Sequence, residues 1–210
     1  MKPFVPGAVL GLAEEPRKGQ AGERAALSDA EAARLARTGD EEAFRMLFER
    51  HSPAVRRFAG NVLRDPADAE EATQETFVRA HARLRHLKDE ARVRGWLLGI
   101  ARIVALDMFA ERRGNGRSSA TPEPPAEVID LDRTPESTLL DAEAERMLFD
   151  ELSRLPAERR AALALRLDQH LGYGEIADVM GWTLQKVKNE IHRARLQMRE
   201  RLLRYLRGGP

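Results

Sequence analysis

Apolar side chains recur at every third or fourth position through most of two stretches, residues 28–113 and residues 136–206. This spacing places them on one face of an α-helix, whereas a strand would alternate apolar and polar residues, a pattern that this sequence lacks. No segment repeats another. The pattern therefore predicts an all-α fold of amphipathic helices that bury their apolar faces against one another.

The first stretch predicts four helices. Ser28, Asp40 and Asp65 have side chains that cap the first turn of a helix, and a proline follows Asp65 at the position where a helix tolerates it best. Pro53 predicts a kink or a break in the second helix, because its ring removes one backbone donor. The four helices are expected at about residues 28–38, 40–62, 66–87 and 92–113.

The segment from Tyr173 to Leu206 predicts a helix-turn-helix. Gly181 lies between two helical patterns and can adopt the left-handed conformation of a tight turn, and Thr183 can cap the helix that follows. Shorter helical patterns precede this motif near residues 136–155 and 161–167. The apolar face of the last helix comprises Val187, Ile191, Ala194, Met198 and Leu202.

Charge is unevenly distributed, although the formal net charge is only +1. From Trp182 to the end, eight lysines and arginines stand against two glutamates. Residues 118–145 carry eight carboxylates against one arginine. The turn glycine between two amphipathic helices makes a simple solvated face a poor account of the cations, so we expect the last helix to bind DNA phosphates and bases.

Composition excludes several classes of protein. With 42% hydrophobic and 33% charged residues in 210, the chain is typical of soluble helical proteins. The absence of cysteine excludes disulfides and thiolate zinc sites and fits a cytoplasmic location. The most apolar stretch, residues 96–110, contains Arg102 and Asp107 and is too short to span a bilayer, so no membrane insertion is expected.

Nothing in the sequence predicts catalysis. It has no glycine-rich phosphate loop, nucleophile elbow or cluster with metal-ligand spacing, and His81 and His86 lack further ligands. We therefore expect no enzyme, metal or cofactor. The expected organisation is a disordered leader (1–27), a helical domain (28–114), an acidic linker (115–135) and a second helical domain (136–207).

Three groups of residues resemble the extracytoplasmic-function (ECF) class of sigma factors in the sigma-70 family. The sequences of residues 40–48 and 65–80 are similar to regions 2.1 and 2.2 of that class, and residues 96–113 to its promoter-melting helix. Residues 152–160, 173–177 and 187–195 are similar to its domain 4. The motifs occur in the family's own order over about residues 40–206.

The resemblance implies a protein that binds core RNA polymerase and promoter DNA, through domain 2 at the −10 element and domain 4 at the −35 element. In the family, one face of the third helix docks on the coiled coil of the β′ subunit, domain 4 contacts the β flap, and an anti-sigma factor typically sequesters the protein. The residues implied for polymerase binding, expected on a polar surface, are Asp68, Glu71, Gln74, Glu75 and Arg79.

The resemblance also implies two sets of DNA contacts. Those for the −10 element and the displaced strand are Lys88, Asp89, Arg92, Arg94, Trp96, Arg102, Arg112 and Arg113. Trp96 lies on the apolar stripe, which favours a core position over base stacking. Those for the −35 element are Thr183, Gln185, Lys186, Lys188, Asn189, His192 and Arg193.

This chain departs from the family at three positions of the last helix. Lys186 replaces a threonine, Asn189 a serine, and Glu190 an arginine that commonly helps bind DNA. A carboxylate beside phosphates is expected to lower affinity, unless Glu190 itself contacts a cytosine.

Two alternatives stay open at this point. A helix-turn-helix regulator could bind operators without polymerase, although it would have no use for residues 68–80. The protein could also act chiefly as an interaction module held by an inhibitor.

The acidic linker either mimics nucleic acid in a cationic channel of polymerase or serves as a charged spacer.

Overall fold

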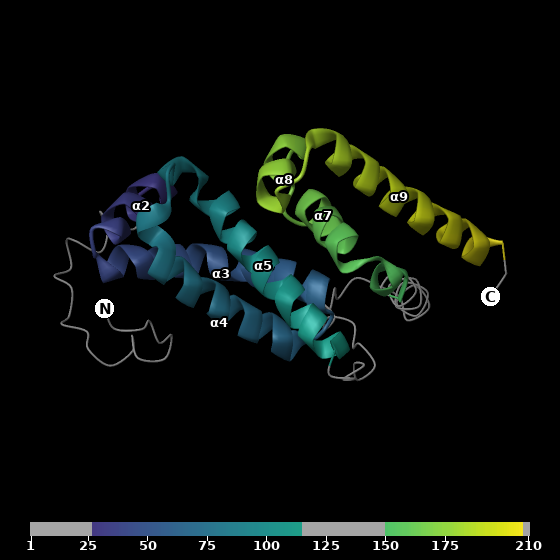
Figure 1. Cartoon of the computed structure of the whole chain (residues 1–210), viewed down its shortest axis with the longest axis horizontal. Helices are drawn as coiled ribbons and strands as arrows, with labels where there is room; N and C mark the ends of the chain where they lie inside the picture. The colour runs from purple at the N-terminus through teal and green to yellow at the C-terminus, as the bar shows by residue number, and fades with distance from the viewer. Residues whose placement is uncertain (1–26, 115–149, 208–210) are drawn as a thin grey trace, which may run out of the picture.

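The computed structural model describes residues 27–114 and 150–207, and within these ranges every regular element is a helix. The all-α expectation is therefore confirmed (Figure 1). The expected leader, the acidic linker and the helical pattern up to residue 149 lie outside the described residues. The elements are α2 (Asp29–Arg37), α3 (Glu41–Leu63), α4 (Pro66–Arg83), η2 (Leu84–His86), η3 (Glu90–Arg92), α5 (Val93–Gly114), α7 (Ala157–Leu167), α8 (Tyr173–Met180) and α9 (Leu184–Leu206).

The capping residues start the first three helices as the sequence predicts. Ser28 forms a capping box with Glu31 at the start of α2. The Asp40 carboxylate accepts from the Ala43 amide at 3.0 Å, and that of Asp65 accepts from the Asp68 amide at 3.0 Å. These bonds satisfy amides that have no partner inside the helix, so the helix starts are fixed locally.

Pro53 does not break α3, which is one helix from Glu41 to Leu63. The predicted break is therefore absent. Val55, Phe58 and Val62 follow the proline on the buried face and are at most 1% exposed. Their burial outweighs the one backbone hydrogen bond that proline removes.

The helix-turn-helix forms as predicted. Gly181 ends α8 with φ 65°, in the left-handed region that favours glycine. Thr183 Oγ1 accepts from the Lys186 amide at 3.2 Å and so caps α9. Val187, Ile191 and Ala194 are at most 1% exposed, which confirms the predicted inner face of α9 over its first turns.

The two halves of the chain pack directly against each other. α7 and α8 lie alongside α3 and α5, and α9 covers the far side of α7 (Figure 1). Phe58 and Leu97 of the first half share one continuous apolar cluster with Leu165 and Ile176 of the second. The two halves therefore pack as one body in this structure. Two domains joined only by a linker would not need to touch.

Arg160 of α7 anchors this contact. Its side chain is buried, and its Nε donates to the Val62 carbonyl at 3.0 Å, at the C-terminal end of α3. Its Nη1 donates to the carbonyls of Leu152, Ser153 and Leu155. Burial lowers the Arg160 pKa to about 10. A cation suits this place because the last carbonyls of α3 lack partners within the helix and form the negative end of its dipole.

No helix among residues 27–114 and 150–207 is long and apolar enough to cross a membrane.

Candidate nucleic-acid and polymerase interfaces

One surface of α9 is polar and exposed. Thr183, Gln185, Lys186, Lys188, Asn189, His192 and Arg193 are all exposed and surround the buried stripe of the helix. The helix is held on α7 by that stripe, so these side chains point away from the rest of the protein. The structure thus brings together all seven residues that the sequence predicts for the −35 element.

Contacts within this surface orient several of its side chains. Gln185 Nε2 donates to Asn189 Oδ1 at 3.0 Å, which leaves the Asn189 amide group free to donate outward. The Lys186 ammonium lies 4.1 Å from the centre of the Trp182 ring, a cation–π contact that holds it over the start of α9. The charge of Lys186 is thus kept where the first amides of the helix face solvent.

Glu190 differs from its neighbours because it is largely buried between α9 and α7. Its Oε2 accepts from Arg159 Nε at 2.7 Å, and its Oε1 accepts from Arg193 Nη1 at 3.0 Å. The hydrogen bond from Arg159 holds the pKa of Glu190 below its usual value, so the carboxylate is ionised at neutral pH.

The residues predicted for the −10 element do not form one patch. Lys88, Asp89, Arg92 and Arg94 are exposed at the start of α5, whereas Arg112 lies near its end. At a rise of 1.5 Å per residue these ends are roughly 30 Å apart. The cations implied for the −10 element therefore lie at separate places along the helix.

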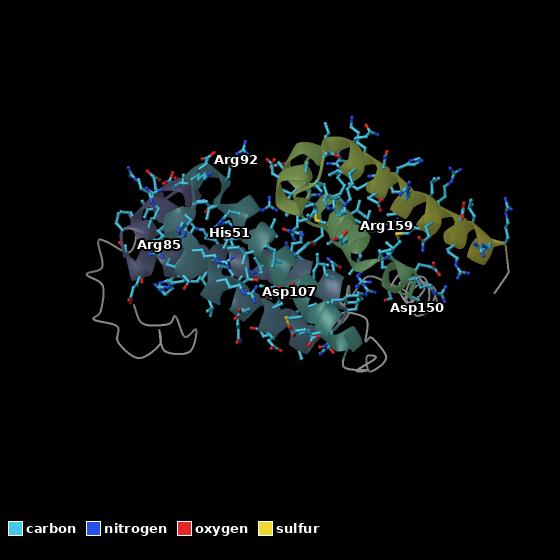
Figure 2. The ribbon with its side chains drawn as sticks, in the orientation of Figure 1. His51, Arg85, Arg92, Asp107, Asp150 and Arg159 are labelled. Atoms are coloured by element: carbon cyan, nitrogen blue, oxygen red, sulfur yellow. The ribbon has the colours of Figure 1, made fainter. Side chains whose placement is uncertain are left out.

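Two arginines at the start of α5 contact the second half of the chain. Arg92 Nη1 donates to Asp178 Oδ2 of α8 at 3.1 Å, and Figure 2 shows Arg92 on the side of the first half that faces α8. Arg94 Nη2 donates to the Gln169 carbonyl at 2.9 Å. Trp96 is half-buried and packs against the core, as the sequence favours, and Arg102 is half-buried as well. The side chain of Arg113 lies outside the described residues.

A shallow groove of about 610 Å³ runs between α4 and α5. Four of the five residues predicted to bind polymerase line it, joined by side chains of α5. Arg79 bonds to Glu75 at 2.6 Å and approaches Asp107 at 3.7 Å, and Figure 2 shows Asp107 on α5. The principal lining residues are Glu71, Gln74, Glu75, Val78, Arg79, Asp107, Met108 and Glu111.

Asp68 is the exception, since it is only 4% exposed and lies outside this groove. The expectation that it stands on a polar surface is wrong. Its Oδ1 accepts from Arg112 Nη2, and Arg112 also approaches Asp65 at 3.6 Å. Burial raises the pKa of Asp68, an effect that the nearby Arg112 opposes. Arg112 therefore joins the end of α5 to the start of α4.

Comparison with known proteins identifies the two halves. Residues 47–114 match the model of sigma-70 region 2, and residues 145–198 match sigma-70 region 4. The chain is 32% identical over 182 residues to the ECF RNA polymerase sigma factor SigM of Mycobacterium tuberculosis, covering 87% of this chain and 88% of the relative. The chain belongs to the ECF class of the sigma-70 family.

The chain spans about two thirds of the length of another relative. The ECF RNA polymerase sigma factor SigE of Mycolicibacterium smegmatis is 35% identical over 171 residues, or 80% of this chain and 66% of that protein. Sigma factors are not enzymes, so the expected lack of catalysis is confirmed by membership of the family.

Two solved structures share the fold of this sigma factor. CnrH in complex with the cytosolic domain of CnrY gives a TM-score of 0.62 at 23% identity, covering 83% of this chain and 96% of that one. The sigma factor RpoE in complex with the anti-sigma factor NepR from Bartonella quintana gives 0.58 at 21%, covering 76% and 96%.

Three residues organise this sigma factor in ways that the sequence did not predict. Arg159, Arg160 and Gln169 of region 4 hold α7 to α9 and to region 2. The Gln169 side chain is fully buried, and its Nε2 donates to the Ala54 carbonyl at 3.1 Å. Nothing in the local sequence marks Gln169. Arg159 and Arg160 belong to a family motif, but the partners of their side chains depend on tertiary contacts.

Proposed function

We propose that this sigma factor binds core RNA polymerase, directs it to promoters and helps open the DNA. The observation that carries the proposal is the exposed cationic surface of α9 in a chain that also matches sigma-70 region 2. Purified chain should co-migrate with core polymerase in gel filtration and bind duplex DNA specifically only in that complex. Specific DNA binding by the free chain, with no affinity for polymerase, would instead support an operator-binding regulator.

In this proposal α9 enters the major groove of the −35 element. Its exposed side chains have the chemistry that the groove requires, since lysine and arginine donate to guanine and asparagine pairs with adenine. Lys188, Asn189, His192 and Arg193 contact bases. Thr183, Gln185 and Lys186, at the start of the helix, contact phosphates, where the helix dipole also favours an anion.

The start of α5 and the segment before it contact the −10 element. Lys88, Asp89, Arg92 and Arg94 are exposed there within a short distance of one another along the chain. Three cations suit the backbone of a separated strand, and the irregular segment between η2 and η3 carries the Asp89 carboxylate, which could contact an unstacked base. Arg102, Arg112 and Arg113 lie farther along the helix and would contact DNA only outside this first site.

The groove between α4 and α5 is the proposed docking site for the β′ coiled coil of polymerase. Glu71, Glu75, Asp107 and Glu111 give it an acidic lining around Arg79. Val78 and Met108 add apolar area between the charges. A cationic helix with a narrow apolar face would match both, and the charges would set its register.

Promoter recognition requires the two halves to separate. Elements centred near −10 and −35 lie about 25 base pairs apart, roughly 85 Å at 3.4 Å per base pair. In this arrangement Arg92 and Arg94, proposed for the −10 element, bond directly to region 4, which carries the surface proposed for the −35 element. The compact arrangement is therefore proposed to be the state of the free protein, and polymerase to bind the extended one.

An anti-sigma factor is the expected inhibitor. Of the two structural relatives above, RpoE was solved in complex with the anti-sigma factor NepR, and CnrH with the cytosolic domain of CnrY. A partner that stabilises the contact between α5 and α8 would keep Arg92 and Arg94 from DNA. Adding such a partner should release the chain from polymerase, and continued promoter binding in its presence would contradict this part of the proposal.

A further inference from the structure

Glu190 lies on α9 yet faces the interior of the protein. Its side chain is 17% exposed, whereas Lys188, Asn189 and His192 are exposed. The reason is its place on the helix, three residues after Val187 and four before Ala194, both of which are fully buried. Glu190 therefore lies at the boundary between the buried stripe and the surface proposed to contact DNA.

The Glu190 carboxylate joins two arginines of different exposure. Arg159, on α7, is 21% exposed and bonds to one carboxylate oxygen, while Arg193, one turn farther along α9, is 63% exposed and bonds to the other. A charge-assisted hydrogen bond on each oxygen holds the carboxylate in a fixed orientation. Arg159 thus connects the supporting helix, through Glu190, to an arginine at the surface.

These contacts leave one edge of the Arg193 guanidinium available. Glu190 engages Nη1, and in the described part of the chain Nε and Nη2 have no hydrogen-bond partner. Two parallel donors on one edge match the O6 and N7 acceptors of guanine in the major groove. Because Glu190 already restricts the side chain, less conformational freedom is lost when it binds.

We propose that Glu190 is a positioning residue, which holds Arg193 so that its free edge contacts a guanine of the −35 element. The inference rests on the proposed function of α9. In this proposal Glu190 acts through the arginines that its two oxygens accept from, and it contacts no base itself. Its charge also lies between two cations, so the trio Arg159, Glu190 and Arg193 presents a net positive charge to the phosphates.

Selection from a duplex library tests the proposal. Core polymerase carrying the full chain would select from promoters randomised across the upstream element, and the selected base frequencies would be compared between variants. We expect the wild type to prefer guanine at one position. Arg193→Lys keeps the charge but loses the paired donors, and should reduce that preference on the order of tenfold.

Glu190→Gln should weaken the preference for guanine at the same position, by less than Arg193→Lys does, while affinity for unrelated DNA stays equal or rises because a negative charge is removed. Arg195→Ala is the matched control, since it removes an exposed cation of α9 outside the proposed contact surface and away from Glu190, and it should leave the guanine position unchanged. If Glu190 had only a structural role, Glu190→Gln would lower the melting temperature and weaken the base preference at all promoter positions alike.

The possible outcomes distinguish a failure of the Glu190 positioning role from a failure of the proposed sigma function. If Arg193→Lys retains the guanine preference, or Glu190→Gln folds and changes no single position, the positioning role is overturned while the sigma function stands. If Glu190→Gln does not fold, Glu190→Asp takes its place, because it keeps the charge and shortens the reach to Arg193; it should weaken the same guanine preference, and an unchanged preference would overturn the positioning role. If wild-type chain selects no sequence with polymerase, the proposed function fails and the inference with it.

Discussion

Arg94 donates from Nη2 to both the backbone carbonyl and the side-chain Oε1 of Gln169, at 2.9 and 3.2 Å. One partner is an arginine proposed to contact promoter DNA, and the other is a fully buried glutamine of region 4. In this arrangement the Nη2 group that binds Gln169 is not available to DNA. This pair therefore couples the compact arrangement of the two halves to the availability of region 2 for DNA.

Replacing Gln169 should loosen the compact state. In Gln169→Ala the half-buried Ala54 carbonyl loses a donor and Arg94 loses a side-chain acceptor, so the free energy of unfolding should fall by about 2 kcal/mol. Chemical denaturation would measure this change. Gln185→Ala, at an exposed position, is the control and should change stability by less than about 0.5 kcal/mol. Equal stability of both variants would contradict the role of Gln169.

Opening of the molecule can be observed by energy transfer between two dyes. The chain contains no cysteine, so Ala91→Cys and Leu184→Cys, exposed positions within a few residues of the paired Arg92 and Asp178, would be the only labelling sites. We expect high transfer in the free chain and a marked fall when core polymerase is added. Transfer that stays unchanged in the polymerase complex would show that the halves do not separate.

Arg160 should be the most sensitive position in the contact between the halves. Arg160→Ala leaves carbonyls of α3 and of residues 152–155 without their donor and opens a gap beside Phe109. A loss of about 3 kcal/mol in the free energy of unfolding is expected, measured by denaturant titration. Arg154→Ala removes an exposed arginine of the same segment and should cost less than about 1 kcal/mol. A loss equal to that of the control would refute the anchoring role.

Substitution of Asp68 should change stability, whereas substitutions around Gln74 in the groove should change polymerase binding. Asp68→Ala removes the buried partner of Arg112 and should lower the free energy of unfolding by about 2 kcal/mol. Reversing charge in the groove, with Glu71→Lys, Gln74→Lys and Glu75→Lys together, should abolish polymerase binding while the melting temperature changes little. Glu158→Lys, exposed on α7, is the matched reversal outside the groove. Retained affinity in a pull-down with the triple variant would exclude the groove as the docking site.

Acid should destabilise the protein partly through His51. This histidine is buried beside Asp29, and Arg50 and Arg94 are also near it. Burial lowers the pKa of His51 below the usual 6.5, although the negative charge of Asp29 acts to raise it. The unfolded chain therefore binds a proton at a higher pH than the folded one, so stability falls as the pH drops below about 6.5. His51→Gln should reduce the slope of stability against pH in this window. An unchanged slope would show that His51 does not titrate on unfolding.

The parts of the fold that depend on local chemistry could be predicted from the sequence. Ser28, Asp40 and Asp65 cap helices, and Gly181 turns the chain, because each acts on backbone groups within a few residues of itself. The exposed face of α9 follows equally from its helical period. These features required no knowledge of the neighbouring helices.

Other features depend on which helices meet and could not be derived in this way. Asp68 follows the cap of α4 and suits an exposed first turn, yet the end of α5 covers it and supplies Arg112. Glu190 offered a partial signal, because its spacing from Val187 and Ala194 places it beside the buried stripe. Its partner Arg159, however, lies 31 positions away in the sequence.

Transcription from a defined template tests the central claim most directly. Core polymerase would be supplied with the full chain and a template that carries the selected promoter, and run-off RNA would be measured. The account predicts one promoter-specific transcript that depends on the chain, and that is strongly reduced by the charge reversal in the groove between α4 and α5. Transcription that is absent with the wild-type chain, or equal with and without it, would contradict the assignment of sigma activity.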